Sequence, residues 1–425
     1  MDAAGQSKAR SGEARSAAPR TRTAIVLIGS RVTGSTPGAV WLTAAGWAEA
    51  ARRRFGRVIM ITATGAIDPA EARTAATTSQ PASGPPTTGR RRLLTARTAA
   101  KDVRDLGRAL VFARHASQSV PRGTDAAMVW QHHEPWQWSG WLLARRCRVP
   151  WVLFVDAPVV WESRAWGVRR PGWGRLLERL GEVPQLRRAD VVACVSTAVA
   201  QEVRRLGAPA ERVVVTPCSA DPEVFTRTPP GASQLRQDLG LEQRVVVGWL
   251  GSFRRFHGIE LLLEAYATAR EDHPELALLL VGDGSERRNV EEDIRSRGLP
   301  GVVFTGMVTH DQVPRHLAVM DIGVVVDPGA SQWHYSPLKL QEYMASGLAV
   351  VAPRSGQVPT TVRDHREGLL VPPNDARALA ACLLELARDP QLRDRLGTAA
   401  RARSEASGGW ERQLDQIMAR VNRRE

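Results

Sequence analysis

The chain has 425 residues, a length that predicts two or three domains, each large enough to bury a core of its own. Its 43% hydrophobic and 24% charged residues exclude a largely disordered or fibrous protein, and no stretch approaches the roughly 20 apolar residues of a membrane span. The net charge of +14 is concentrated at one end, because residues 1–120 contain 19 basic and 7 acidic residues.

The start of the chain and its cysteines indicate the cellular compartment. The first 22 residues lack the apolar core of a secretory signal, so we expect a cytoplasmic protein. Cys147, Cys194, Cys218 and Cys382 are far apart and form no CxxC pair. Neither a disulfide framework nor a structural metal is therefore expected.

The first part of the chain alternates apolar runs with helix-like stretches after a basic tail, residues 1–21, that is predicted to be disordered. An Ala-rich helix is expected to end near Ala50, and the Pro-rich residues 74–92 are predicted to be mobile. The predicted strands cover residues 24–30, 57–63, 150–156 and 191–196. This alternation predicts a parallel sheet with crossover helices.

A second alternation begins near Arg244, after a Pro-rich stretch at 221–234 that is typical of a domain linker. Its predicted strands cover residues 245–252, 276–284, 302–308, 322–328 and 349–355, and its predicted helices cover 258–269, 285–297, 310–319 and a stretch from about 337. The fold class is therefore α/β, with two doubly wound Rossmann-like domains facing a central cleft. Such domains bind ligands at the carboxyl ends of their strands.

Four segments are predicted to divide the chain. They are the tail (1–21), an N-terminal acceptor-side domain (22–225), a C-terminal nucleotide-sugar-binding domain (226–404) and a C-terminal helix (405–425) expected to pack back on the N-terminal domain.

Several motifs follow one another in a fixed order. LGSFRRFHG (250–258), LLLVGDGSE (278–286), VVFTGMV (302–308) and SPLKLQEYM (336–344) resemble the C-terminal domain of family 4 retaining glycosyltransferases, which have the GT-B fold. The similarity extends upstream to residues 28–40, 149–162 and 189–225, and the SPLKLxEYM-type motif indicates a sub-branch of the family. The resemblance implies a metal-independent hexosyltransferase that takes a sugar from a UDP- or GDP-sugar and needs no cofactor besides this donor substrate.

The SPLKLQEYM motif contains the groups that a nucleotide diphosphate needs. Ser336 and Leu338 open a helix whose first N–H groups can face the diphosphate, and Lys339 adds a positive charge. Glu342, one turn further on, can accept hydrogen bonds from both ribose hydroxyls. Without the motif, Glu342 would be interpreted as a solvated helical carboxylate.

The other donor-site residues follow from the resemblance. Ser252 and His257 replace an Arg and a Lys that most relatives carry in the phosphate loop, and we expect Arg254 or Arg255 to restore the lost charge. Asp283 caps the next helix or serves the turn. The glycines and backbone groups expected at the donor are Gly251, Gly282, Gly306, Met307 and Val308, with Gly29 and Gly38 bounding the loop toward the distal phosphate.

Asp156, His334 and Lys339 are the predicted catalytic residues. His334 stands eight positions before Glu342, where many relatives carry a Glu beside the donor sugar, and it cannot supply a fixed negative charge. Asp156 ends a strand facing the sugar. Glu162, His132 and His133 are candidates for the acceptor side, although adjacent histidines on a strand point to opposite faces.

Other interpretations stay open at this point. Ten of the 13 tryptophans precede residue 174, which suits either a glycolipid acceptor or ordinary core packing. The basic end could contact an anionic membrane, with Arg90, Arg91 and Arg92 as the densest cluster. Nucleic-acid binding is disfavoured because no recognition motif accompanies the charge. An epimerase of the same fold, or a catalytically degenerate relative acting as a binding or scaffold protein in polysaccharide assembly, are the competing functions.

Overall fold

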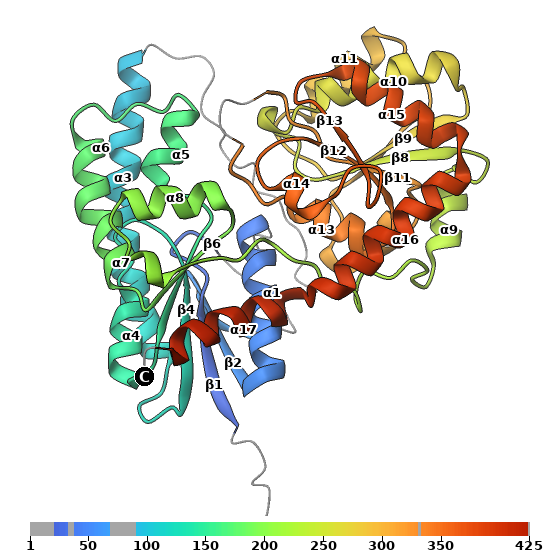
Figure 1. Cartoon of the computed structure of the whole chain (residues 1–425). Coiled ribbons are helices and arrows are strands. Elements are labelled where there is room, and N and C mark those ends of the chain that lie inside the picture. Colours follow the sequence, from blue (N-terminus) through green and yellow to red (C-terminus); the bar gives the residue numbers. More distant parts are fainter. Residues whose placement is uncertain (1–20, 33–37, 69–90, 330–332, 424–425) are drawn as a thin grey trace, which may run out of the picture.

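The computed structural model describes residues 21–32, 38–68, 91–329 and 333–423. Two sheets, each covered by helices on both faces, form the two halves of the molecule (Figure 1). This confirms the predicted fold class of two doubly wound domains. Within the described residues, no helix is both long and apolar enough to cross a membrane.

The first sheet has seven strands in the order β3-β2-β1-β4-β5-β6-β7. All neighbours are parallel except β2 and β3. The strands are β1 (Arg22–Leu27), β2 (Gly56–Thr62), β3 (Gly65–Ile67), β4 (Ala126–His132), β5 (Trp151–Val155), β6 (Val191–Cys194) and β7 (Val213–Val215). Every residue of β4, β5 and β6 is buried, as expected where helices cover both faces of a parallel sheet.

The second sheet has six parallel strands in the order β10-β9-β8-β11-β12-β13. They are β8 (Val245–Leu250), β9 (Leu276–Val281), β10 (Val302–Gly306), β11 (Ile322–Val324), β12 (Ala349–Pro353) and β13 (Leu369–Val371). The strand order reverses at β8 and β11, and ligands of open α/β sheets bind at such a reversal.

The helices connect and cover the strands. Those up to the second sheet are α1 (Ala39–Phe55), α3 (Arg91–Ser119), α4 (Ser139–Cys147), α5 (Val159–Ala165), α6 (Trp173–Leu176), a π-helix (Leu177–Glu182), α7 (Val183–Arg188), α8 (Thr197–Arg205), a 3-10 turn (Ala210–Arg212) and α9 (Ala232–Asp238). Those that follow are a 3-10 turn (Arg255–His257), α10 (Ile259–Asp272), α11 (Arg287–Ser296), a 3-10 turn (His310–Gln312), α12 (Val313–Leu317), α13 (Leu338–Ala345), α14 (Val358–Thr361), α15 (Ala376–Arg388), α16 (Pro390–Ser407) and α17 (Gly409–Asn422).

The last helix returns to the first half of the molecule. In Figure 1, α17 lies beside α1, although the two helices are at opposite ends of the sequence. Trp410, Leu414, Ile417 and Val421 of α17 belong to the same buried apolar cluster as the strands of the first sheet. The first core is therefore completed by the end of the chain.

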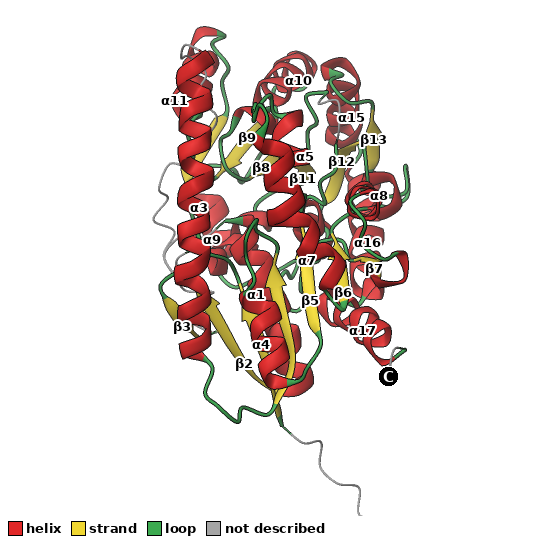
Figure 2. Cartoon of the chain, turned by 90° about the vertical axis from the view of Figure 1, so that its left-hand side faces the viewer, coloured by secondary structure: helices red, strands yellow, loops and turns green. Residues whose placement is uncertain are grey.

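Helix α3 is a feature that the sequence analysis does not predict. Figure 2 shows it running along the outside of the first half. It begins at Arg91, so the prediction of a mobile segment was wrong for Arg91 and Arg92. The rest of that segment up to residue 90, like the predicted tail up to residue 20, lies outside the described residues.

Candidate active site

Three glycines lie at the carboxyl ends of adjacent strands of the second sheet. The Gly282 N–H donates to the Gly306 carbonyl at 2.9 Å. Gly282 has a φ of +125°, and a Cβ added there would lie 2.0 Å from the carbonyl oxygen of Gly251. Only glycine fits such a close backbone approach. The three strand ends therefore form a floor made of backbone.

The predicted phosphate loop packs directly on this floor. The Phe253 N–H donates to the Asp283 carbonyl at 2.9 Å, while the Asp283 carboxylate accepts from the Gly284 N–H at 2.7 Å and so stabilises its own turn. His257 Nδ1 lies 2.5 Å from the Ser252 carbonyl oxygen. Burial, with the nearby Lys339 charge, lowers the pKa of His257 to about 3, so its ring is neutral. The imidazole holds the loop and does not replace the missing cation.

Two arginines of the same loop differ in exposure. Arg254 is partly buried, and burial lowers its pKa, whereas Arg255 is exposed. Which of them contacts a phosphate stays a prediction.

Helix α13 places Lys339 below the end of β8. The Lys339 ammonium lies 4.1 Å from the centre of the Trp249 ring, and a Cβ at Gly251 would come within 2.8 Å of it. Burial lowers the pKa of Lys339 to about 7, although the Glu342 carboxylate opposes this effect. Because the environment penalises the charged ammonium, an anion bound here would be held strongly.

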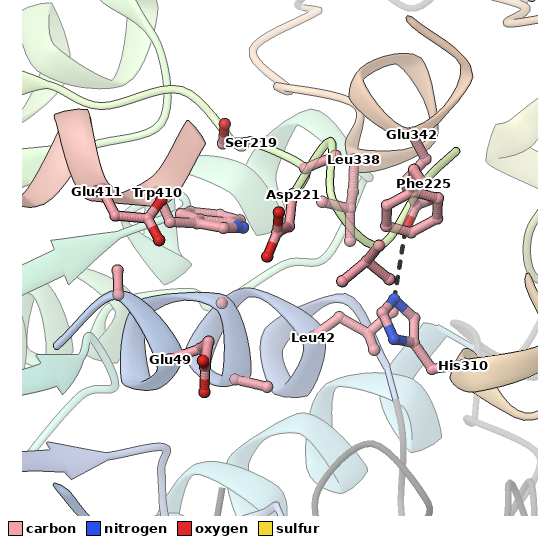
Figure 3. A pocket seen from close by; sticks show the side chains of 15 residues that line it. Leu42, Glu49, Ser219, Asp221, Phe225, His310, Leu338, Glu342, Trp410 and Glu411 are labelled. Atoms are coloured by element: carbon pink, nitrogen blue, oxygen red, sulfur yellow. Dashed lines mark ion pairs between the residues drawn. The ribbon is translucent and has the colours of Figure 1, made fainter. Parts of the chain in front are cut away.

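Glu342 is buried one helical turn after Lys339. Its Oε1 lies 3.6 Å from His310 Nε2, the ion pair that Figure 3 marks with a dashed line. Both residues line a cavity of about 50 Å³ at the base of the cleft. Since pockets for ligands of nucleotide size hold roughly 300–1,000 Å³, this cavity alone is too small for a nucleotide.

The cavity is built from four parts of the chain (Figure 3). These are α1, residues 219–225 of the passage between the sheets, α13 with the turn at His310, and α17. The passage is tied to the start of α13, because the Cys218 N–H donates to Ser336 Oγ at 2.9 Å. Glu342 is therefore positioned by both halves of the molecule.

On the first half of the molecule, His132 and Asp156 meet at adjacent strand ends. His132 Nε2 lies 2.7 Å from Asp156 Oδ2. Burial disfavours the imidazolium, but the hydrogen bond and charge of Asp156 outweigh it and raise the pKa of His132. The contact with Asp156 therefore favours the protonated form of His132.

His133 points the other way, as the alternation of a strand requires. Its side chain is fully buried, and its Nε2 lies 4.0 Å from Glu182 Oε1. Burial lowers the pKa of His133 to about 3 and raises the pKa of Glu182 to about 7. His133 therefore belongs to the interior, and only His132 reaches the candidate site.

The loop after β1 is held by a carboxylate that the sequence analysis does not assign. Glu134 Oε2 accepts from the Ser30 N–H at 2.8 Å and from the Ser30 hydroxyl at 2.7 Å. A Cβ at Gly29 would lie 2.6 Å from Glu134 Oε1, and Gly29 has a φ of +138°. Gly38, in extended conformation, precedes α1 and is exposed. Glu134 thus packs against Gly29, whereas Gly38 has no neighbouring atom within 4 Å of a Cβ added there.

His334 makes a contact across the cleft. Its Nε2 lies 3.3 Å from Glu162 Oε1 of α5, and its ring packs edge-on against Trp161 at 4.8 Å between centroids. The position that carries a carboxylate in many relatives therefore carries an imidazole that faces a carboxylate from the other half.

Two family models match most of the chain. The model described as Glycosyltransferase Family 4 matches residues 42–224, and the model described as Glycosyl transferases group 1 matches residues 244–389. The chain belongs to glycosyltransferase family 4. The first match covers the strand ends with His132 and Asp156, and the second covers the glycine floor, Lys339 and Glu342.

Curated relatives of this family 4 chain are distant. A GDP-mannose-dependent alpha-(1-6)-phosphatidylinositol monomannoside mannosyltransferase of Mycolicibacterium smegmatis is 28% identical over 245 residues, which is 54% of this chain and 62% of the relative. An alpha-D-kanosaminyltransferase of Streptomyces kanamyceticus is 27% identical, over 51% of this chain and 55% of the relative. The matched region thus spans little more than half the length of these relatives.

Solved structures share the fold over nearly the whole chain. HepE of Anabaena in complex with UDP-glucose superposes with a TM-score of 0.65 at 18% identity, covering 94% of this chain and 99% of HepE. Sucrose-phosphate synthase of Thermosynechococcus elongatus superposes with a TM-score of 0.67 at 23% identity, covering 95% of this chain and 98% of the synthase. At these identities the likeness establishes the fold.

The predicted site residues of the family 4 chain fall into two groups, one on each half of the molecule. The donor-side groups of the second half lie together around the glycine floor, where Met307 and Val308 follow β10 and Met307 is exposed. Asp156, His132 and Glu162 are on the first half, and Glu162 is the one that touches the donor side. His310 and Glu134 were missed. Among the described residues, no cluster of three His, Cys, Asp or Glu side chains could hold a metal ion.

Four of the ten tryptophans that precede residue 174 belong to the interior. Trp41, Trp47, Trp130 and Trp151 are buried in the first core. Trp161 is partly buried against the same core and also contacts His334 of the second half.

Proposed function

We propose that the protein is a retaining hexosyltransferase that moves a sugar from a UDP- or GDP-sugar to a hydroxyl of a glycan, glycolipid or other acceptor. The observation that carries the proposal is the placement of Lys339 and Glu342 on one face of α13, at the glycine floor of the second sheet. A cation and a buried carboxylate one turn apart fit a diphosphate and a ribose diol.

In this proposal the donor lies across the glycine floor. Its diphosphate receives the Lys339 ammonium, the first N–H groups of α13 beginning at Leu338, and a guanidinium from Arg254 or Arg255. When the donor binds, Glu342 loses its contact with His310 and accepts hydrogen bonds from the ribose hydroxyls. The backbone of Gly306, Met307 and Val308 faces the base.

The chemical step breaks the bond between the anomeric carbon and the diphosphate oxygen. Lys339 stabilises the charge that develops on the leaving diphosphate. Asp156, on the opposite side, faces the cationic sugar, and His334 orients a ring hydroxyl. In a front-face reaction the leaving phosphate oxygen takes the acceptor proton, so the proposal requires neither a protein general base nor a metal or cofactor.

The donor is proposed as a UDP- or GDP-sugar because relatives use both. HepE is described with UDP-glucose, and the Mycolicibacterium relative is named for GDP-mannose. The latter also acts on a phosphatidylinositol mannoside, which supports a glycolipid acceptor and peripheral contact with an anionic membrane.

Thermal-shift measurements with UDP, GDP, ADP and their sugars test the donor. Stabilisation by one nucleotide, increasing with its concentration, is expected and identifies the donor class. Stabilisation by none would favour the scaffold alternative. With a donor identified, the anomeric configuration of the transferred sugar, measured by NMR, decides whether the reaction retains it.

A further inference from the structure

Helix α3 exposes a stripe of large apolar side chains. Val103, Leu106, Leu110 and Val111 are 71%, 40%, 68% and 58% exposed. Their spacing of three, four and one residues places them on one side of the helix. On the opposite side, Phe112 and two alanines are buried in the domain. Half of the exposed large apolar side chains found among the described residues are on this helix.

A second stripe, of basic residues, runs beside the apolar one. Arg97, Lys101, Arg104 and Arg108 are all exposed and are spaced four, three and four residues apart. This spacing keeps them on one edge of α3. In an ordinary amphipathic helix the apolar side faces the protein core, whereas α3 exposes an apolar stripe as well as a basic one.

The acidic residues of α3 offset only part of this charge. Asp102 is largely buried and accepts from Arg170 Nε at 2.8 Å. Asp105 is also buried and is paired with Arg31 and, at 3.6 Å, with Arg108. The exposed charged side chains of the described part of the helix are consequently all basic.

The basic stripe borders a cavity of about 490 Å³. Arg104, Arg108 and Val111 of α3 line one side of it, and Ser30, at the end of β1, lines the other. Ser30 is the residue whose N–H and hydroxyl bind Glu134. The cavity therefore lies between the basic edge of α3 and the residues that follow β1 and β2.

We propose that the outer face of α3 is a docking surface for an anionic phospholipid membrane. A helix with exposed aliphatic side chains and an adjacent row of Arg and Lys inserts its apolar stripe at the boundary of head groups and acyl chains, while its cations bind anionic head groups. When α3 is docked in this way, the mouth of the cavity beside Ser30 lies at the level of the lipid head groups. A second copy of the chain fits this face poorly, because two such faces would oppose cation to cation.

The membrane contact itself is part of the proposed function, on which this assignment of the contact to α3 rests. The test measures co-sedimentation of the full chain with vesicles of pure phosphatidylcholine and of phosphatidylcholine mixed with phosphatidylglycerol. We expect binding that rises with the anionic fraction and falls with salt.

Two double variants locate the surface. Arg97→Gln with Arg104→Gln is expected to weaken partitioning into anionic vesicles about 30-fold, which is about 5-fold for each lost charge. Leu110→Gln with Val111→Gln is expected to weaken it at least about 10-fold. The matched control, Arg288→Gln with Arg295→Gln, removes two exposed charges from α11 in the second half and should bind like the wild type.

Each outcome is decisive. If both α3 variants bind vesicles like the wild type, the surface assignment is wrong although membrane contact stands. If the wild type binds neutral and anionic vesicles equally, both the membrane contact and its assignment to α3 are wrong. Stabilisation by a nucleotide, measured on the same samples, tests the enzyme proposal separately. A change of oligomeric state in the α3 variants without loss of vesicle binding would make the face a protein interface and overturn the inference.

Discussion

Glu342 is a carboxylate whose burial needs a reason. It is 4% exposed, and its Oε1 lies 3.6 Å from His310 Nε2. If it binds the ribose, Glu342→Ala removes two hydrogen bonds to a charged acceptor, about 1.5–3 kcal/mol each. Titration calorimetry with the identified nucleotide should show this loss of affinity. Glu264→Ala, an exposed carboxylate on α10, is the control. Unchanged affinity in a folded Glu342→Ala protein would remove the ribose assignment.

The lowered pKa of Lys339 predicts a pH dependence of binding. With a pKa of about 7, Lys339 is largely neutral at pH 8 in the free protein. A bound diphosphate favours the charged form, so binding at pH 8 should take up a proton, and affinity should fall as the pH rises above about 7. Calorimetry in buffers of different ionisation enthalpy measures this uptake. It should disappear in Lys339→Met, whereas persistence there would assign the proton to another group.

Lys339 is also predicted to act on turnover more than on folding. Its charge stabilises the leaving diphosphate, so Lys339→Met should lower kcat strongly, by about 10-fold for each 1.4 kcal/mol of lost transition-state stabilisation. Steady-state kinetics measure kcat, and thermal denaturation serves as the folding control. If the variant keeps the wild-type kcat, the role belongs to Arg254 or Arg255. The kcat values of Arg254→Gln and Arg255→Gln would then show which of the two it is.

Sequence reasoning selected the proposed donor residues but missed the side chains that contact them. Lys339 and Glu342 were predictable because their motif is continuous. His310 and Glu134 were not, since each meets its partner only through the fold: His310 is 32 residues from Glu342, and Glu134 is 104 residues from Ser30. The loss of charge at His257 was expected from the sequence, and burial keeps its imidazole neutral.

At the scale of elements, the turn after β9 has almost no tolerance for a side chain. Gly282→Ala would impose a φ of +125° on alanine and bring its Cβ to 2.0 Å from the Gly251 backbone. We expect this substitution to displace the phosphate loop and weaken nucleotide stabilisation in thermal-shift assays. Gly298→Ala also has a positive φ, of +61°, but no neighbour within 4 Å. It is therefore the control, and equal behaviour of the two variants would contradict the close-contact argument.

The elements differ in how well their sequences predict them. Most strands of the two sheets were predicted because buried parallel strands are short apolar runs between polar stretches, but the three-residue strands β3, β7 and β13 were not. The long helix α3 was not, because its apolar side chains are divided between an inward face and an outward stripe. Such a division removes the single apolar face by which an amphipathic helix is recognised.

At the scale of the whole molecule, α17 ties the end of the chain to its beginning. Trp410 is buried, its ring lies 5.5 Å from that of Trp47, and it packs against Gly46. Trp410→Ala should lower the free energy of unfolding of the first half by about 3–5 kcal/mol. Scanning calorimetry should show a lower Tm for that half, with Gln416→Ala on the exposed side of α17 as the control. A Tm like that of the wild type would mean that α17 contributes little to the first core.

The chain passes between the two halves twice, once near Asp221 and once at Gly408–Gly409. Both passages lie at the same place, since Arg53 of α1 binds Asp221 and Glu411 at 2.9 Å each. We expect these two adjacent passages to act as a hinge between the halves. The contact between His334 and Glu162 joins the halves away from the passages, as does the hydrogen bond from the Thr197 N–H to Gln357 Oε1. A rotation that lets nucleotides exchange is therefore expected to break both contacts, while Glu342, beside the passages, moves least.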